Sequence, residues 1–303
     1  MPVPTEQTIA LTRLTLRAQC WGEPDAPPLL ALHGWLDNAG SFALLAPLLA
    51  GSHRVLALDL PGHGHSDHAA GGGDYHYIDQ VRAVLEAAEV LQLARYTLLG
   101  HSMGAGIASL VAAAAPGRIE RLLLIEGLGP LGDDGSATLT RFRTALAARA
   151  QGRRPQRVFD SVEQAVSARC LASGMPTAQA RPIVERGLIE TDGGWRWRSD
   201  PRLTRPSAAR LAESQVHALL RGIEAPTALL LARPATPYLP SAPMLARAAC
   251  VAQMTVQHMD GGHHLQLEHP EAVAAWARAA PRESPAIAST PFEDHQQPQE
   301  YHP

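Results

Sequence analysis

The stretch YTLLGHSMGAGIASLVAAAA, residues 96–115, decides the fold. It begins as a short apolar run typical of a buried strand and continues as a small, apolar helix pattern. Between the two lies a G-x-S-x-G pentapeptide centred on Ser102. A tight strand-to-helix turn strains the backbone of the middle serine, and only glycine avoids clashes beside it. We therefore predict that Ser102 is a nucleophile at a helix N-terminus, where developing negative charge is favoured; a glycine-rich turn with a capping serine is the alternative.

The same alternation of apolar runs and helix patterns extends along the chain. The pattern predicts strands at residues 27–34, 53–62, 96–102, 119–127, 227–233 and 251–259, and helices at 78–93, 103–115 and 270–280. The strands lack in/out alternation, as expected when a sheet is covered on both faces. Residues 8–22 do alternate and suit an antiparallel edge pair. Strands that alternate with helices predict an α/β fold with a doubly wound, mostly parallel sheet.

Residues 128–222 interrupt this rhythm with helical stretches rich in Arg and Ala. We interpret them as a helical cap inserted into a core formed by residues 1–127 and 223–280. Six arginines between positions 141 and 157 could receive an anionic substrate group or form a solvated helix face. Trp195 and Trp197 could line the mouth of a pocket or anchor the cap. Residues 281–303 are poor in hydrophobic residues and rich in Pro and Gln, which predicts disorder.

Composition narrows the classes of function. The 303 residues are 46% hydrophobic and 18% charged with a net charge of -3, so no charge excess favours nucleic acid or an anionic membrane as partner. Three separated cysteines without a C-x-x-C pair favour a cytoplasmic location and indicate no zinc motif. The first residues lack a signal-peptide pattern and no apolar run reaches 18 residues, so neither export nor a membrane span is expected. Composition does not predict the oligomeric state.

The segment GGHHLQLEHP, residues 261–270, offers a general base between the last predicted strand and the last predicted helix. Two adjacent histidines compete for the role. His263 follows Gly262 directly, while His264 would point elsewhere. A hydrogen-bonded loop histidine or a metal ligand is the alternative, but the serine turn upstream favours a catalytic histidine.

Together these motifs resemble the α/β-hydrolase superfamily, and HGWLDNAGSF with GHSMGAG is most similar to its serine-hydrolase-like subgroup with a helical cap. The matching segments are HGW (33–35), DLPGHGHSD (59–67), GHSMG (100–104) and GHHLQLEHP (262–270). The resemblance implies that Ser102 is the nucleophile and His263 the base. It also implies an oxyanion hole formed by the amides of Trp35 and Met103. The histidine-rich PGHGHSDH (61–68) could bind a metal ion, but the resemblance makes it a structural turn.

The acid is where this sequence departs from the family pattern. In most members it follows the strand matched by residues 227–233, yet LLLARPATPYLP (229–240) contains neither Asp nor Glu. A minority of members place the acid one strand earlier, where Glu126 closes the run IERLLLIE. Burying an unpaired carboxylate is costly, so we predict that Glu126 is the acid and not a loop carboxylate or a helix cap. Asp260 is too near His263 in sequence, and Asp133 and Asp134 are a distant second choice.

The set Ser102, Glu126 and His263 predicts acyl transfer through an acyl-enzyme. A serine nucleophile disfavours dehalogenase and epoxide-hydrolase chemistry, which need a carboxylate nucleophile. The prediction is therefore a hydrolase of a small or medium carboxylic ester or thioester, with no cofactor and no metal. C–C or lactone hydrolysis and perhydrolysis on the same residues are alternatives. A non-catalytic ligand-binding homologue is another, because no acid follows residues 227–233.

Overall fold

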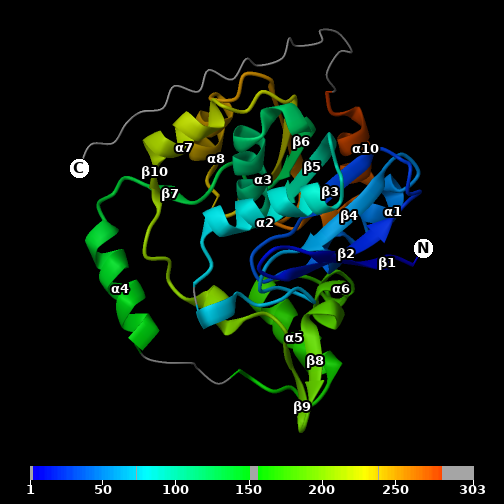
Figure 1. The fold of residues 1–303 in the computed structure, drawn as a ribbon, viewed down its shortest axis with the longest axis vertical. Coiled ribbons are helices and arrows are strands. Elements are labelled where there is room, and N and C mark those ends of the chain that lie inside the picture. The colour runs from blue at the N-terminus through cyan, green and yellow to red at the C-terminus, as the bar shows by residue number, and fades with distance from the viewer. Residues whose placement is uncertain (1–2, 73, 151–155, 238, 282–303) are drawn as a thin grey trace.

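A computed structural model describes residues 3–72, 74–150, 156–237 and 239–281, and an eight-stranded sheet lies at its centre (Figure 1). The strand order is β1-β2-β4-β3-β5-β6-β11-β12. Only β1 and β2 run antiparallel to their neighbours, and every pair from β4 to β12 is parallel. The strands are β1 (Thr5–Ala10), β2 (Thr15–Trp21), β3 (Pro28–Leu32), β4 (Arg54–Asp59), β5 (Tyr96–His101), β6 (Ile119–Ile125), β11 (Thr227–Arg233) and β12 (Met254–Asp260). The predicted doubly wound, mostly parallel sheet with an antiparallel edge pair is confirmed.

Helices cover both faces of the sheet, as its strand composition requires. One apolar cluster joins alternate strand residues such as Leu30 and Leu32 to the helices α2 (Tyr77–Val90), α3 (Met103–Ala114), α7 (Glu213–Leu220) and α8 (Ser241–Ala248). A second cluster joins Leu29 and Ala31 to α1 (Ala46–Leu49) and α10 (Pro270–Ala279), while the short α9 (Leu265–Glu268) precedes α10. In the described ranges, no helix has the length and apolar character that crossing a bilayer requires. The tail predicted to be disordered lies outside the described residues beyond Pro281.

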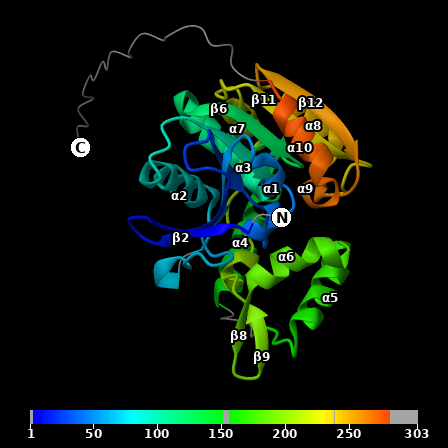
Figure 2. The same cartoon turned by 90° about the vertical axis from the view of Figure 1, so that its right-hand side faces the viewer.

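The inserted segment contributes helices α4 (Thr138–Ala150), α5 (Val162–Ser173) and α6 (Thr177–Gly187). It also forms a hairpin that the sequence pattern did not predict, β8 (Leu188–Thr191) with β9 (Gly194–Trp197), and a short pair, β7 (Gly132–Asp133) with β10 (Leu211–Ala212). Ser161 caps the start of α5 and Gly174, at φ 73°, ends it. Both views place α5, α6, β8 and β9 together at one end of the molecule (Figure 2).

A separate apolar cluster lies in this part of the insertion and extends to the core. Phe159, Val166 and Ile183 are buried there, and the rings of Trp195 and Trp197 pack against them. The ring centroids of Phe159 and Trp197 lie 5.4 Å apart in an edge-on arrangement. Leu267 of α9 belongs to the same cluster and Leu44 packs against it, so the cluster joins the insertion to the core, which supports the anchoring alternative for the two tryptophans.

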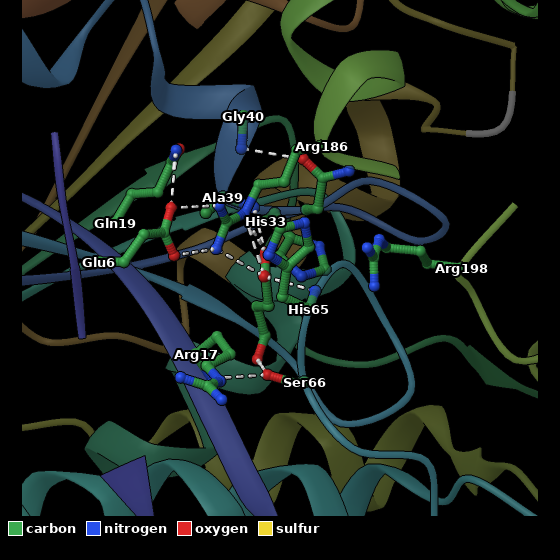
Figure 3. Close-up of polar contacts among 12 residues, drawn as sticks. Glu6, Arg17, Gln19, His33, Ala39, Gly40, His65, Ser66, Arg186 and Arg198 are labelled. Atoms are coloured by element: carbon green, nitrogen blue, oxygen red, sulfur yellow. Dashed lines mark hydrogen bonds and ion pairs between the residues drawn. The ribbon is translucent and has the colours of Figure 1, made fainter. Parts of the chain in front are cut away.

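An ion network centred on a buried arginine joins the insertion to the sheet (Figure 3). Arg186 of α6 lies with its Nη2 2.8 Å from Oδ2 of Asp59, at the end of β4, and donates from Nη1 to Oε1 of Glu6 at 2.6 Å. The Asp59 carboxylate is fully buried and also accepts from the amides of Ala39 and His65. Gly64, at φ 50°, is required here because a Cβ would lie 2.3 Å from the carboxyl carbon of Asp59. PGHGHSDH thus forms a turn around Asp59, in agreement with the structural interpretation.

Arg186→Met is expected to lower the free energy of unfolding by about 3–5 kcal/mol, because it leaves the buried Asp59 charge without its cation. Urea unfolding followed by circular dichroism measures the change. Arg181→Met is the matched control, since Arg181 lies on the same helix with an exposed side chain paired to Glu185. Equal losses in the two variants would show that the Asp59 pair contributes nothing specific.

Stability is expected to fall as the pH drops below 6.5, because His63 is buried as a neutral ring. Burial and the nearby His33 lower the pKa of His63 from 6.5 to about 3. Between pH 6.5 and pH 3 the His63 ring is therefore protonated in the unfolded chain and neutral in the folded chain. The contribution of the neutral ring to the free energy of unfolding is complete above pH 6.5 and declines toward pH 3. The expected slope is about 1.4 kcal/mol per pH unit.

The slope of unfolding free energy against pH, measured by urea unfolding from pH 4 to pH 7, tests this expectation. In His63→Gln this slope should be smaller by about 1.4 kcal/mol per pH unit. The comparison uses slopes, so it holds even if the variant is less stable overall. His76→Gln removes an exposed imidazole and serves as the control. If His63→Gln and the parent chain have the same slope, the buried ring does not account for the loss.

Candidate active site

Ser102 lies at a strained turn between β5 and α3. Its backbone has φ 53° and ψ −116°, outside the regions that a residue with a side chain normally adopts. Its amide donates to the carbonyl of Ile125 at 2.9 Å, which ties the turn to the end of β6. A Cβ on Gly104 would lie 2.1 Å from the carbonyl oxygen of Leu32, and one on Gly100 would lie 2.6 Å from Cα of Ala105. The G-x-S-x-G glycines are therefore required by close backbone packing, and the serine is presented partly exposed at the helix N-terminus.

Glu126 follows β6 directly and turns across the sheet toward the end of β11. Its backbone is also strained, at φ 51°, and only 2% of the residue is exposed. Oε1 accepts a hydrogen bond of 2.6 Å from the amide of Ala232, and Oε2 accepts one of 3.2 Å from the hydroxyl of Thr236. The carboxylate thus lies at the end of the strand that carries no acid of its own.

His263 meets this carboxylate. Its Nδ1 lies 3.1 Å from Oε2 of Glu126, although 137 positions separate the two residues in the chain. Because a carboxylate only accepts, Nδ1 carries the proton and Nε2 is left as the basic nitrogen. The loop is held by Glu268, whose Oε2 accepts a 2.7 Å hydrogen bond from the amide of Gly262. The adjacent His264 points elsewhere, with Nε2 3.2 Å from Oδ2 of Asp37.

The two predicted oxyanion donors lie beside this turn. Met103 is the first residue of α3, and Trp35 follows Gly34 after β3. Neither amide has a hydrogen-bond acceptor among the described residues. The chain turns sharply after Trp35, because Leu36 has φ 59° and the amide of Asp37 donates to the carbonyl of Gly34 at 3.2 Å. Two amides at the ends of neighbouring parallel strands are thus available to a ligand at the same edge of the sheet.

A buried polar cluster beside these residues was not predicted from the sequence. Asp37 is 2% exposed and accepts from Ser41 at 3.0 Å, besides its contacts with His264 and with the guanidinium of Arg169. Burial alone would raise the pKa of Asp37, but the bond from His264 and the charge of Arg169 hold it well below its usual value. The position of Asp37 two residues after HGW was the available signal, but spacing alone does not reveal partners so far away in the chain.

His101 completes this cluster. It is fully buried, and burial together with the neighbouring His264 and His263 lowers its pKa well below the usual value. Its Nε2 lies 2.8 Å from the carbonyl oxygen of His263, so Nε2 carries the proton and Nδ1 a lone pair. The residue before the candidate nucleophile Ser102 is therefore hydrogen-bonded to the backbone of the candidate base.

The alternative acids, the arginine cluster and the histidine-rich segment named from the sequence are not part of the contact between His263 and Glu126. Asp260 is exposed on β12, Asp133 is paired with Arg141, and Asp134 bonds to Ser136. Among the arginines between positions 141 and 157, Arg141 has that carboxylate partner and Arg149 lies 3.6 Å from Asp74. The two arginines at 153 and 154 lie outside the described residues. Within the described chain, the donor atoms that could share a metal ion belong to Asp37, His101 and His264, not to PGHGHSDH.

Comparisons with known proteins all find relatives with the α/β-hydrolase fold. A family model described as the α/β-hydrolase fold matches residues 27–171. The chain is 32% identical over 286 residues to the serine hydrolase-like protein of Danio rerio, covering 91% of this chain and 85% of that one. A crystal structure of a hypothetical protein from Pseudomonas aeruginosa PAO1 is 40% identical, with a TM-score of 0.84 over 91% of this chain and 97% of that chain. The thioesterase domain from the curacin biosynthetic pathway is 25% identical, with a TM-score of 0.81 over 92% of this chain and 100% of that chain.

Proposed function

Because the chain belongs to the α/β-hydrolase superfamily, we propose that it is a serine hydrolase that cleaves a small or medium carboxylic ester or thioester. The observation that carries the proposal is the 3.1 Å contact between Nδ1 of His263 and Oε2 of Glu126. A carboxylate bonded to one ring nitrogen leaves the other nitrogen basic. Together with a serine on a strained strand-to-helix turn, this contact gives each of the three residues a distinct role.

In the proposed reaction, Oγ of Ser102 attacks the carbonyl carbon of the substrate and its proton passes to Nε2 of His263. Glu126 holds the ring in the tautomer that accepts this proton and stabilises the imidazolium that results. When the tetrahedral intermediate collapses, the imidazolium donates the proton to the departing alcohol or thiol. Water then attacks the acyl-enzyme with His263 again as base, which releases the carboxylic acid and restores Ser102.

The amides of Trp35 and Met103 are proposed to bind the negative oxygen of both tetrahedral intermediates. In hydrolases of this kind, removing one such donor lowers kcat by about 100- to 1,000-fold. These two amides are fixed by the ends of β3 and β5, so they need no rearrangement when charge develops on the substrate oxygen.

We also propose that residues 128–222 act as a cap on this site. Three contacts from that segment reach the loop that follows β3. Nε1 of Trp35 donates to the carbonyl of Leu203 at 3.0 Å, and Nδ2 of Asn38 donates to the carbonyl of Ile183 at 2.8 Å. The third is the ion pair of Arg169 with Asp37. A segment bonded to the loop that carries an oxyanion donor is well placed to select the substrate.

Thioesters are included because a thioesterase domain shares the fold over the whole of its length. C–C or lactone hydrolysis and perhydrolysis use the same proton transfers and are distinguished by substrate. The alternative of a non-catalytic ligand-binding homologue was suggested by the lack of an acid after β11. The carboxylate of Glu126, bonded to the amide of Ala232 at that strand end, supports the hydrolase instead.

Labelling with a fluorophosphonate, followed by peptide mapping, tests for an activated serine. We expect covalent capture at Ser102 within minutes and none after denaturation. A panel of nitrophenyl esters, acyl thioesters, lactones and β-diketones, compared by kcat/KM, then ranks the bond classes. Absence of labelling and of turnover across the panel would support the ligand-binding alternative.

A further inference from the structure

The buried cluster behind the proposed triad has the composition of a metal-binding site. Its three donor atoms are Oδ2 of Asp37, Nδ1 of His101 and Nε2 of His264, and all lie within 4.8 Å of one another. They come from three segments: the loop after β3, the end of β5 and the loop after β12. None of them belongs to the proposed nucleophile, acid or base.

Two of the three separations between these atoms approach those of a metal centre. Oδ2 of Asp37 lies 3.2 Å from Nε2 of His264 and 3.9 Å from Nδ1 of His101. Donors bound to Zn²⁺ at about 2.0–2.1 Å in a tetrahedron are roughly 3.3 Å apart. The three donor atoms span up to 4.8 Å, so the rings of His101 and His264 must move toward each other by about an ångström or more to bind one ion.

His101 has a buried nitrogen that is free to bind an ion. Its Nδ1 is buried and has no hydrogen-bond partner among the described residues. Because Nε2 donates to the carbonyl of His263, Nδ1 carries a lone pair. This lone pair lies 3.9 Å from Oδ2 of Asp37, so within the described chain two hydrogen-bond acceptors face each other without a donor between them. A cation placed between them would satisfy both.

Gly34 packs closely against these atoms. A Cβ there would lie 3.0 Å from Nδ1 of His101 and 3.3 Å from Oδ2 of Asp37, so the lack of a side chain at this position keeps both donor atoms uncovered. The side chains of His264 and Arg169 are 11% and 17% exposed, so the cluster lies just below the surface.

We propose that Asp37, His101 and His264 form a binding site for a divalent transition-metal ion of the Zn²⁺ type, and that its occupation inhibits the hydrolase. Two imidazoles and one carboxylate suit Zn²⁺ and disfavour Mg²⁺ or Ca²⁺, which prefer oxygen donors. The inhibitory part rests on the proposed function. His101 adjoins Ser102 in sequence and is bonded to the backbone of His263, so a shift of its ring to reach the ion disturbs both residues.

Binding requires a rearrangement at two of the ligands. Nε2 of His264 now shares a proton with Asp37, and this proton must move to Nδ1 or to solvent so that the nitrogen can bind the ion. Oδ2 of Asp37 accepts from Ser41, while Oδ1 is paired with the cation Arg169. This positive charge opposes a second cation, so the site is expected to bind Zn²⁺ more weakly than a structural zinc centre does.

Equilibrium dialysis of EDTA-treated protein against Zn²⁺, with bound zinc measured by atomic absorption, tests the site without reference to catalysis. We expect one ion per chain in the parent protein and in Ser102→Ala. His264→Gln should weaken binding by about 100-fold or more, while Arg169→Gln should tighten it. Co²⁺ should give the visible absorption of a low-coordinate nitrogen and oxygen site in the parent chain. His258→Gln, at an exposed position on β12, is the matched control.

Two results would overturn the site: equal zinc affinity in His264→Gln and the parent chain, or an affinity that Arg169→Gln leaves unchanged. Circular dichroism of each variant confirms that it is folded. For inhibition, Zn²⁺ should lower ester turnover reversibly in the parent chain and not in His264→Gln at the same concentration. Inhibition that persists in His264→Gln would assign it to another site. Zinc binding in a chain that hydrolyses no ester would leave the metal site standing and overturn the proposed function alone.

Discussion

Ser102→Ala should reduce ester hydrolysis by about 10⁴- to 10⁶-fold and abolish fluorophosphonate labelling. The substitution removes the oxygen that forms the acyl-enzyme and leaves only the modest acceleration that comes from substrate binding and from the amides of Trp35 and Met103. The free energy of unfolding should change little, because the amide of residue 102 and the turn it forms are kept. Stopped and continuous assays with a nitrophenyl ester give kcat and KM separately, and the loss should fall on kcat.

The control for this experiment is Ser173→Ala, at the exposed end of α5, which should label and turn over like the parent chain. If Ser102→Ala retains more than a few per cent of the activity, the measured hydrolysis arises from another residue or from a contaminant, and the assignment of the nucleophile fails.

Glu126→Gln should lower kcat by about 10³- to 10⁴-fold, because changing the acid of a serine triad to an amide leaves the histidine in the wrong tautomer. The amide can present N–H groups to Nδ1 of His263, which favours the ring tautomer with its proton on Nε2. That tautomer cannot accept the proton of Ser102. The amide oxygen can still accept from the amide of Ala232, so the free energy of unfolding should fall by no more than about 1–2 kcal/mol. Labelling rate and urea unfolding measured on one preparation separate the two effects.

Asp260→Asn is the matched control, because Asp260 is the acidic residue nearest to His263 in sequence and is exposed on β12. Its turnover should stay within a few-fold of the parent chain. If Asp260→Asn is the more damaging of the two substitutions, or if Glu126→Gln keeps turnover within a few-fold, a different carboxylate orients the base.

Several elements could be predicted from local pattern alone. The six core strands and the helices α2, α3 and α10 were recognised because each carries its signal within about ten residues. The β8–β9 hairpin was missed, because its apolar residues, Leu188, Trp195 and Trp197, belong to or pack against the small cluster around Phe159 and do not form an alternating pattern typical of a strand. The sequence pattern reads as helical on either side, and a four-residue strand pair adds little signal of its own.

The sequence by itself determined the α/β-hydrolase fold and the strained turn at Ser102. The fold follows from the order of strand and helix patterns along the chain, and the turn follows from glycines within a few residues of Ser102, so local sequence records both. The choice of His263 over His264 as the base stays a prediction. Only the tertiary structure decided that the Glu126 carboxylate crosses from β6 to the end of β11 and meets His263, and that Asp37 gathers His101, His264 and Arg169 around it. Such contacts depend on where strand ends meet in space and on which buried charge needs a partner, and no spacing along the chain encodes either.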